Sequence, residues 1–333
     1  MHTGRRYEPL EFFKWTFTLT IGLLIYNSIP TILYFLGWKF ISIPWQPIAI
    51  LGTALSFIVG FKNNASYGRI WEARQIYGGI INDSRSFAYT VRDVLGKTEM
   101  VQQIFYRHFA WLTTLRFQLR ESRSWENMNN RSNKEFQKNN YTVPEWENKL
   151  EDELKKYLSD DEYQYILTKK NKSTQLTAMQ SDAIATLRNN GTINDFQWVQ
   201  LQTALTKFTD NQGRAERIKN FPYPRNFASM ATYLMFIFIL LLPFGLLKEF
   251  DQLGNGTFME GNTIWFNIPI AAIISWSFHI LDTVGESAVN PFEGSANDIP
   301  ITQISRTIEI DMRDMLDEKE LPPAIRPQNN IVL

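Results

Sequence analysis

The side chains that usually carry catalysis or bind transition metals are scarce in this sequence. It contains no cysteine, which excludes disulfides, thiolate metal sites, iron–sulfur clusters and a cysteine nucleophile. Its three histidines, His2, His108 and His279, are too few for a histidine-rich metal site, and it has no glycine-rich nucleotide-binding motif. We therefore expect no catalytic residue and no cofactor, and we do not expect an enzyme.

The side chains that could act through their size and apolar character are aromatic and regularly spaced. Thr53, Phe57 and Phe61 fall at positions i, i+4 and i+8, so they share one face of a helix. If several copies of the chain packed this helix around a common axis, stacked rings of phenylalanine would form a narrow apolar constriction that can close by dewetting. The alternative is ordinary packing, in which the phenylalanines fill the core of a helix bundle.

A second row, made of small residues, lies beside the first. Gly52, Ser56 and Gly60 have the same spacing of four residues. Small residues at this spacing let neighbouring helices approach closely in a bilayer. We therefore expect this row to be a helix-packing surface beside the aromatic row.

Both rows lie in one of four long segments that have no charged side chain. The segments are residues 15–38, 40–61, 226–247 and 261–281. Crossing a hydrocarbon core of about 30 Å takes roughly 20 apolar helical residues, and each segment is long enough. In a chain with 20% charged residues, four such segments predict a four-pass membrane protein. Four buried core helices of a soluble protein are the alternative.

The basic residues beside these segments predict the orientation of the chain. The short connections 38–46 and 248–263 carry only Lys39 and Lys248, whereas basic residues are frequent before the first segment and throughout 62–225. By the positive-inside rule, both termini and the 62–225 region are expected to be cytoplasmic.

The 62–225 region has the pattern of helices, with no alternating strand pattern. We expect the following features in it: a helix over 71–95, a charged helix over 144–158, helix N-caps at Ser159 and at Asn194 or Asp195, and an exposed loop over 121–143.

In three places the sequence is similar to the bestrophin family of ion channels, in its bacterial branch. The similar segments are FKNNASYGRIWEARQIYGGIINDSR (61–85), AERIKNFPYPRNF (215–227) and VNPFEGSANDIPITQISRTIEIDMRDML (289–316). They occur in the family's order around the same layout of four spans, and the resemblance covers nearly the whole chain. It implies an all-α homopentamer around one central pore, in which each subunit has four transmembrane helices and a large helical cytosolic region.

The resemblance also implies a domain organisation and a set of partners. The domains would be residues 1–61 with the first transmembrane hairpin and the pore neck, 62–225 as a cytosolic helical domain, 226–285 as the second hairpin, and 286–333 as a cytosolic C-terminal strap. The partners would be further copies of the chain, the lipid bilayer of the inner membrane and permeant monovalent ions, with no nucleic acid among them.

Two constrictions are implied by the same resemblance. The neck positions of the family fall on Thr53, Phe57 and Phe61, which is the face already identified from the spacing. The second constriction, a cytosolic aperture, falls on Phe196 in the segment NDFQWV. For Phe196 the alternative is a buried packing residue.

One departure from the family concerns calcium. Animal members carry an acidic calcium clasp just after an Asn-Pro-Phe sequence, and the candidate residues for a weak clasp here are Asn290, Glu293, Ser295 and Asp298, of which Glu293 is out of register with the family. Ca²⁺ takes six to eight oxygen ligands, preferably with several carboxylates. Asp298 matches one carboxylate of the family, but Ser295 stands where the other would be. We therefore expect no tight calcium gating, and a weak calcium site stays open.

The function expected from these observations is a passive ion channel whose apolar rings set the barrier. Uncharged rings do not choose the sign of an ion by Coulomb attraction. Because the sequence resembles the bacterial branch, we expect a preference for monovalent cations, with an anion (chloride) channel of the same architecture as the alternative. A secondary transporter is an alternative of another class. It would have broken helices, and Pro30 and Pro243 are placed to interrupt the first and third spans.

Overall fold

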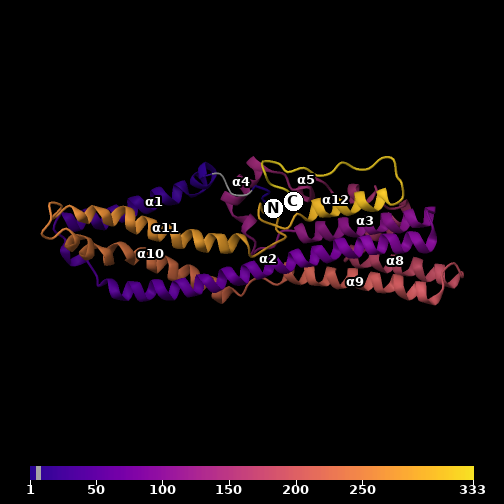
Figure 1. Ribbon diagram of the computed structural model, residues 1–333, viewed down its shortest axis with the longest axis horizontal. Coiled ribbons are helices and arrows are strands. Elements are labelled where there is room, and N and C mark those ends of the chain that lie inside the picture. Colours follow the sequence, from indigo (N-terminus) through magenta and orange to yellow (C-terminus); the bar gives the residue numbers. More distant parts are fainter. Residues whose placement is uncertain (5–8) are drawn as a thin grey trace. The chain divides into compact units, whose positions relative to one another are not determined.

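The computed structural model describes residues 1–4 and 9–333, and nearly all of its regular structure is helical (Figure 1). The helices are α1 (Pro9–Phe35), α2 (Trp45–Leu95), α3 (Glu99–Arg120), α4 (Arg131–Asn140), α5 (Pro144–Glu147), α6 (Leu150–Leu154), α7 (Asp160–Leu167), α8 (Lys172–Asn189), α9 (Asp195–Asn220), α10 (Arg225–Leu253), α11 (Asn267–Ser287) and α12 (Ile301–Asp314). Short 3-10 turns lie at Lys39–Ile41, Asn127–Asn129 and Thr263–Phe266.

The chain divides into two compact units. The first, called the spanning unit below, comprises residues 4–67 and 223–289. The second, called the helical unit, comprises residues 1–3, 68–222 and 290–333. Helix α2 contributes its first part to the spanning unit and its second part to the helical unit.

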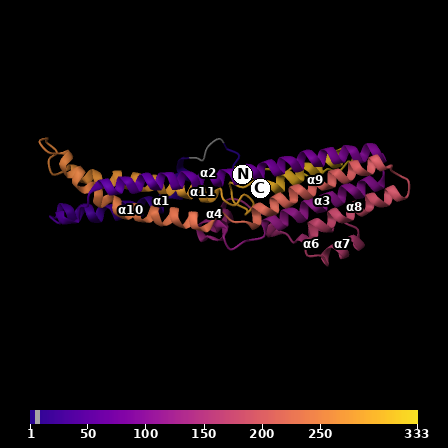
Figure 2. The same cartoon turned by 90° about the horizontal axis from the view of Figure 1, so that it is seen from below.

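The spanning unit is a bundle of α1, α10, α11 and the first part of α2. Helices α1, α10 and α11 pack on one another (Figure 2). Its core is formed by apolar side chains of α2, α10 and α11, namely Ile48, Leu55, Val59, Met235, Phe238, Leu242 and Ala271. Among the described residues, four helices are long and apolar enough to cross a membrane, as the four uncharged segments predicted.

The two prolines in these spans do not break their helices. Pro30 lies inside α1 and Pro243 inside α10, and both helices continue through them. The amide of Asn267 donates to the carbonyl of Pro243 (3.1 Å) and to the hydroxyl of Thr31 (2.9 Å), so neighbouring helices contribute polar partners near the proline. The expected interruption of the first and third spans is therefore wrong.

Helix α2 is longer than the sequence pattern predicted. The second uncharged segment and the amphipathic segment 71–95 were expected as separate elements, but they form one helix of 51 residues. Gly68, Gly78 and Gly79 each cost helix stability of roughly 1 kcal/mol relative to alanine. Packing of the helix at Ala73, Ile76, Tyr77 and Ile80 outweighs this cost, because all four are buried in the core of the helical unit.

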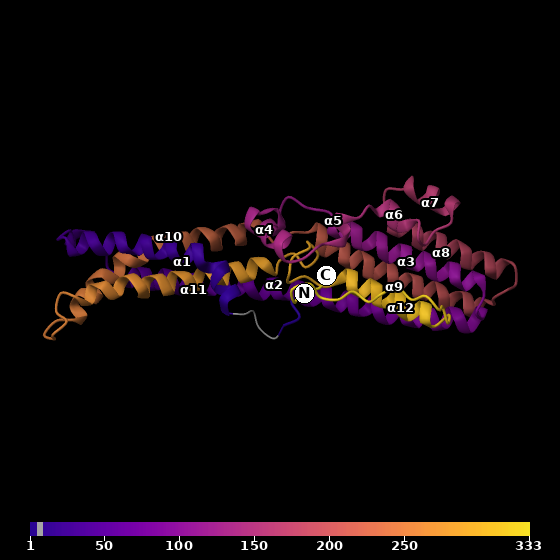
Figure 3. The same ribbon diagram turned by 90° about the horizontal axis from the view of Figure 1, so that it is seen from above.

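The helical unit is built around α3. This helix packs against α8, α9 and α12; Figure 1 shows α12 directly beside α3, and Figure 3 shows the two helices running in nearly the same direction. Residues Met1–Thr3 pair with the last residues of the chain, since the backbone N–H of Thr3 donates to Asn330 and that of Val332 donates to Met1. One face of α12, with Ile301, Ile308 and Met312, is buried within the same subunit.

Some local predictions for this region are confirmed and others are wrong. Ser159 and Asn194 both cap their helices, each in a reciprocal capping box. The stretch 121–143 is not all loop, because it contains α4. The helix expected over 144–158 is divided into α5 and α6, because Asn148 has an extended backbone and its side chain donates to the carbonyl of Pro144.

The centre of the helical unit contains a buried histidine. The ring of His108 packs against Phe208 and Trp111, with centroid distances of 4.6 and 5.2 Å. Its Nε2 lies 2.9 Å from the hydroxyl oxygen of Ser84. Burial lowers the pKa of His108 to about 3, so the imidazole is neutral in the folded chain at ordinary pH.

We predict that His108 makes the fold sensitive to acid. The unfolded chain binds a proton at this imidazole below a pH of about 6.5, whereas the folded chain does not until about pH 3, so stability falls as the pH drops below about 6.5. At pH 5 the loss from this group is about 2 kcal/mol. Melting temperatures at pH 7.5 and pH 5 should differ less for His108→Phe than for the unchanged protein. An equal difference in both proteins would contradict the assignment.

Candidate functional site

The first part of α2 has two opposite faces. On one face of α2, Ile48, Leu55 and Val59 are buried in the core of the spanning unit. The aromatic row lies on the other side, where Phe57 is 66% exposed and Phe61 is 72% exposed. At roughly 100° per residue, the buried residues centre about 180° from Phe57. The helix therefore turns its aromatic row directly away from the core of its own subunit.

This arrangement decides between two interpretations of the aromatic row within one subunit. The phenylalanines do not fill the core of the bundle, which was the packing alternative. Thr53 is exposed as well, and its hydroxyl donates only to the carbonyl of Ala49 in its own helix (2.9 Å). The three side chains thus form a continuous exposed row, while their place in a pore stays a prediction.

The row of small residues packs only in part. A Cβ at Gly52 would lie 2.8 Å from the ring of Phe238, so α10 approaches α2 closely at this glycine. Ser56 is exposed and donates to the carbonyl of Gly52. A Cβ at Gly60 would meet no atom within 4 Å. Within one subunit only Gly52 makes the expected contact, and packing of Ser56 and Gly60 against another subunit remains a prediction.

Phe196 is the second residue of α9 and is 88% exposed. The helix begins there because the side chain of Asn194 accepts from the backbone N–H of Gln197, and the side chain of Gln197 accepts from that of Asn194 (both 2.9 Å). The alternative of a buried packing residue is wrong within the subunit. The ring stands beside the N-terminal end of a helix, where the helix dipole is positive.

The loop with Asn290, Glu293, Ser295 and Asp298 is folded around an arginine. Nη1 of Arg120 in α3 donates to Oδ2 of Asp298 at 2.8 Å, and the side chains of both residues are 1% exposed. The same Asp298 oxygen accepts from the backbone N–H of Gly294 (2.7 Å), and Oδ1 accepts from the hydroxyl of Ser295 (2.5 Å). Both oxygens of this carboxylate therefore have partners inside the loop.

Glu293 is the second carboxyl group of the loop, and it is not suited to a calcium ion. Its Oε2 accepts from the backbone N–H of Asn127 (2.8 Å) and from the amide of Asn290 (3.2 Å), and its buried Oε1 has no partner among the residues that the structure describes. Burial raises the pKa of Glu293 well above its ordinary value, and the nearby carboxylates of Asp298 and Glu126 raise it further. A protonated carboxyl group is a poor ligand for Ca²⁺.

Taken together, these residues do not fit a calcium site. The Asp298 carboxylate is paired with a guanidinium, burial raises the pKa of Glu293, and Ser295 stands where the family's other carboxylate would be. Calcium takes six to eight oxygen ligands, preferably with several carboxylates, whereas this loop places a fixed positive charge, Arg120, against the Asp298 carboxylate. The Asp298 carboxylate therefore has a cationic partner in Arg120.

Arg120 is a residue of this loop's environment that the sequence patterns did not single out. A signal for it was present, because Arg116 and Arg120 lie one helical turn apart in a helix whose other face is apolar. Charged residues are almost never fully buried unless they are paired, so two arginines in such a segment call for acidic partners. Arg116 is paired with Glu145, whose pKa is raised by burial but lowered overall by Arg116 and Arg120.

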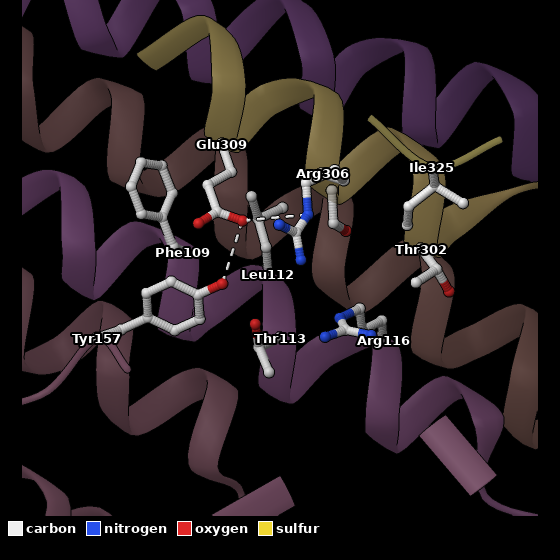
Figure 4. A pocket seen from close by; sticks show the side chains of 10 residues that line it. Phe109, Leu112, Thr113, Arg116, Tyr157, Thr302, Arg306, Glu309 and Ile325 are labelled. Carbon is white, nitrogen blue, oxygen red and sulfur yellow. Dashed lines mark hydrogen bonds and ion pairs between the residues drawn. The ribbon is translucent and has the colours of Figure 1, made fainter. Parts of the chain in front are cut away.

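A small polar cavity lies where α12 meets α3. Its volume is about 20 Å³, roughly enough for one water molecule. Figure 4 shows Tyr157, Arg306 and Glu309 around it, with the hydroxyl of Tyr157 donating to Oε2 of Glu309 (3.1 Å) and the Arg306 guanidinium 3.5 Å from the same oxygen. This cavity is too small for an organic substrate, and its charged groups join α12 to the rest of the unit.

Comparison with known proteins places these features in a family context. The family model described as Bacterial/Fungal Bestrophin protein matches residues 13–314 of the chain. The Voltage-dependent anion channel-forming protein YneE of Escherichia coli (strain K12) is 27% identical over 299 residues, which cover 90% of this chain and 84% of the relative. The protein of the same name from Salmonella typhi is 25% identical over 318 residues, which cover 95% of this chain and 90% of the relative.

The fold has a counterpart among solved structures. A bacterial Bestrophin homolog from Klebsiella pneumoniae matches with a TM-score of 0.74 and 22% sequence identity, covering 90% of this chain and 98% of that chain. At this identity the match concerns the fold, and it confirms the mainly helical architecture.

We predict that the Arg120 loop holds its structure independently of calcium. Arg120→Gln should destabilise the protein by about 3–5 kcal/mol, because it leaves the buried Asp298 carboxylate without its cation. The matched control is Arg123→Gln, which removes an arginine whose acidic partner Glu121 is mostly exposed, and a change below about 0.5 kcal/mol is expected there. The melting temperature of the unchanged protein should be the same in calcium and in a chelator. A calcium-dependent rise would show that the loop binds the ion.

Proposed function

The chain belongs to the bacterial and fungal bestrophin family, and on that basis we propose that it forms a homopentameric channel that passes small monovalent ions across a membrane. The observation that carries the proposal is the exposed aromatic row of α2. Phe57 and Phe61 face away from the core of their own subunit, although their helix is apolar enough to span a membrane. In the proposed channel these side chains meet their copies from the other subunits and form the neck.

The neck acts as a barrier through its lack of charge. An ion that enters a narrow ring of phenylalanines loses part of its hydration shell and gains no fixed charge in return. The hydroxyl of Thr53 is the one polar side chain of the row, and it lies at one end. Passage through such a ring depends on its diameter, which small side-chain movements change.

The second proposed constriction is a ring of Phe196 side chains. Its support is that the ring of Phe196 is almost fully exposed at the start of a capped helix. Backbone N–H groups at this helix end carry partial positive charge, so they interact differently with anions and cations. We propose that this aperture contributes more to ion preference than the neck does.

The orientation of the channel follows from its charges. We propose that it lies in the inner membrane with both termini and the helical unit in the cytoplasm. The support is the excess of lysine and arginine next to the spans on that side.

The sign of the permeant ion is the finer part of the proposal. The relatives from Escherichia coli and Salmonella typhi are named as anion channel-forming proteins, which favours anions over the cations expected from the sequence. The exposed neck residues carry no charge and are compatible with either sign. A cation-selective pore therefore stays the second candidate, and the reversal potential below separates the two.

A secondary transporter is less well supported. Transporters of this kind use discontinuous helices at the membrane midplane. Helices α1 and α10 continue through Pro30 and Pro243, so neither provides such a break.

Shortening the neck side chains should widen the pore. We predict that Phe57→Ala and Phe61→Ala each raise single-channel conductance several-fold in planar bilayers, because the apolar ring loses most of its bulk. Phe236→Ala is the matched control, since Phe236 is also exposed, at 60%, but lies on α10, and its conductance should not change. If the neck variants lose the oligomer while the conductance of the remaining channels is unaltered, the two residues serve packing and the neck assignment is wrong.

Phe196→Ala should change ion preference more than conductance. Reversal potentials under a KCl gradient give the relative permeability of K⁺ and Cl⁻ for the unchanged channel and for the variant. We predict that Phe196→Ala shifts this ratio more than Phe57→Ala does, because the positive end of α9 lies beside Phe196. Phe221→Ala, an exposed phenylalanine after the other end of α9, is the control. Equal ratios in all of these proteins would remove Phe196 from the pathway.

A further inference from the structure

A buried ion-pair cluster lies directly next to the proposed neck. Nζ of Lys62, the residue after Phe61, lies 2.8 Å from Oδ1 of Asp282 and 3.3 Å from Oε1 of Glu286. The side chains of Lys62 and Asp282 are 2% and 6% exposed, and that of Glu286 is 44% exposed. The two acidic residues lie one helical turn apart on α11, so both reach the same lysine on α2.

The next residue adds a second contact between the same two helices. The side-chain amide of Asn63 donates to the backbone carbonyl of Leu281 (3.0 Å). A Cβ at Gly285 would lie only 1.9 Å from Oδ1 of Asn63, so a larger residue there would force the Asn63 amide to move. Lys62 and Asn63 together connect α2 to α11 through side chains that allow little variation in their relative position.

The side of α2 on which Lys62 lies links these contacts to the orientation of the aromatic row. Lys62 continues the buried row of Leu55 and Val59 at spacings of four and three, roughly opposite Phe57 on the helix. Rotating α2 about its axis would turn the aromatic row and would at the same time pull Nζ of Lys62 away from the two carboxylates. Apolar contacts in a bundle allow such sliding more readily than this pair does, because separating Lys62 from Asp282 would leave two buried charges without partners.

We propose that the cluster of Lys62, Asp282 and Glu286 sets the rotation of α2 and so keeps Phe57 and Phe61 facing the pore. These three are positioning residues, because they act on the permeating ion through the aromatic row. The proposal rests on the proposed function, and the experiment below distinguishes the failure of one from the failure of the other.

The chain has no cysteine, which makes a single introduced thiol a clean reporter of rotation. Thr53→Cys places a thiol on the aromatic row, and Ile58→Cys places one on the flank of the helix, where the residue is only partly exposed. A membrane-impermeant methanethiosulfonate reagent is applied to open channels in bilayers, and the rate at which the current changes measures access to each thiol. With Lys62 and Asp282 in place, we expect Thr53→Cys to react about tenfold faster than Ile58→Cys.

The same two reporters are then measured together with Lys62→Met and Asp282→Asn. This double change removes the ion pair without leaving a buried lysine or aspartate charge unpaired, which favours folding. The proposal expects the difference between the two reaction rates to shrink several-fold, because α2 is then free to rotate. Lys62→Arg, which keeps the pair, should preserve the difference.

The possible outcomes distinguish a failure of this proposal from a failure of the neck assignment. If the double change lowers the melting temperature but leaves both rates as they were, the cluster serves stability alone and the proposal is overturned. If the reagent does not change the current of the Thr53→Cys channel even with the cluster intact, the neck assignment fails and the proposal fails with it. Where the double variant does not assemble, Lys62→Leu combined with Asp282→Leu takes its place, because an apolar pair of similar volume also removes the ion pair without leaving either charge buried, and unchanged rates in that variant overturn the proposal in the same way.

Discussion

The structure depends on the requirement that α2 present two different faces along one uninterrupted helix. In the spanning unit its buried face carries Ile48, Leu55, Val59 and Lys62, and these side chains pack on or pair with α10 and α11. A helix in a bilayer satisfies its backbone hydrogen bonds internally, so its side chains alone decide what each face contacts. With one face buried in the core of the spanning unit, the aromatic row is left exposed.

Buried charge is the second theme of the structure. Lys62 with Asp282, Arg120 with Asp298, and Arg116 with Glu145 are ion pairs whose members are largely removed from solvent. Such pairs add little net stability compared with apolar residues of the same shape, because desolvation offsets the attraction. Their effect is geometric, since an ion pair fixes which residues face each other. In the loop after Asn290, this geometry brings the guanidinium of Arg120 to the carboxylate of Asp298.

Much of the architecture could be predicted from the sequence. The four spans follow from uncharged segments of about 20 residues, and the helix caps at Ser159 and Asn194 follow from local side-chain chemistry. The shared face of Thr53, Phe57 and Phe61 follows from helical spacing alone. These features depend on residues close together in the chain, so the sequence by itself determined them.

Other features depend on residues far apart in the chain, and only the tertiary structure decided them. The sequence does not reveal that Asp282 pairs with Lys62, 220 residues away, or that Arg120 reaches Asp298, 178 residues away. It also does not reveal that α2 continues past its glycines, because core packing there outweighs helix propensity. Whether Phe57 and Phe196 are buried or exposed is likewise set by which face the rest of the fold covers. Periodicity identifies a face of a helix, and only packing determines what that face meets.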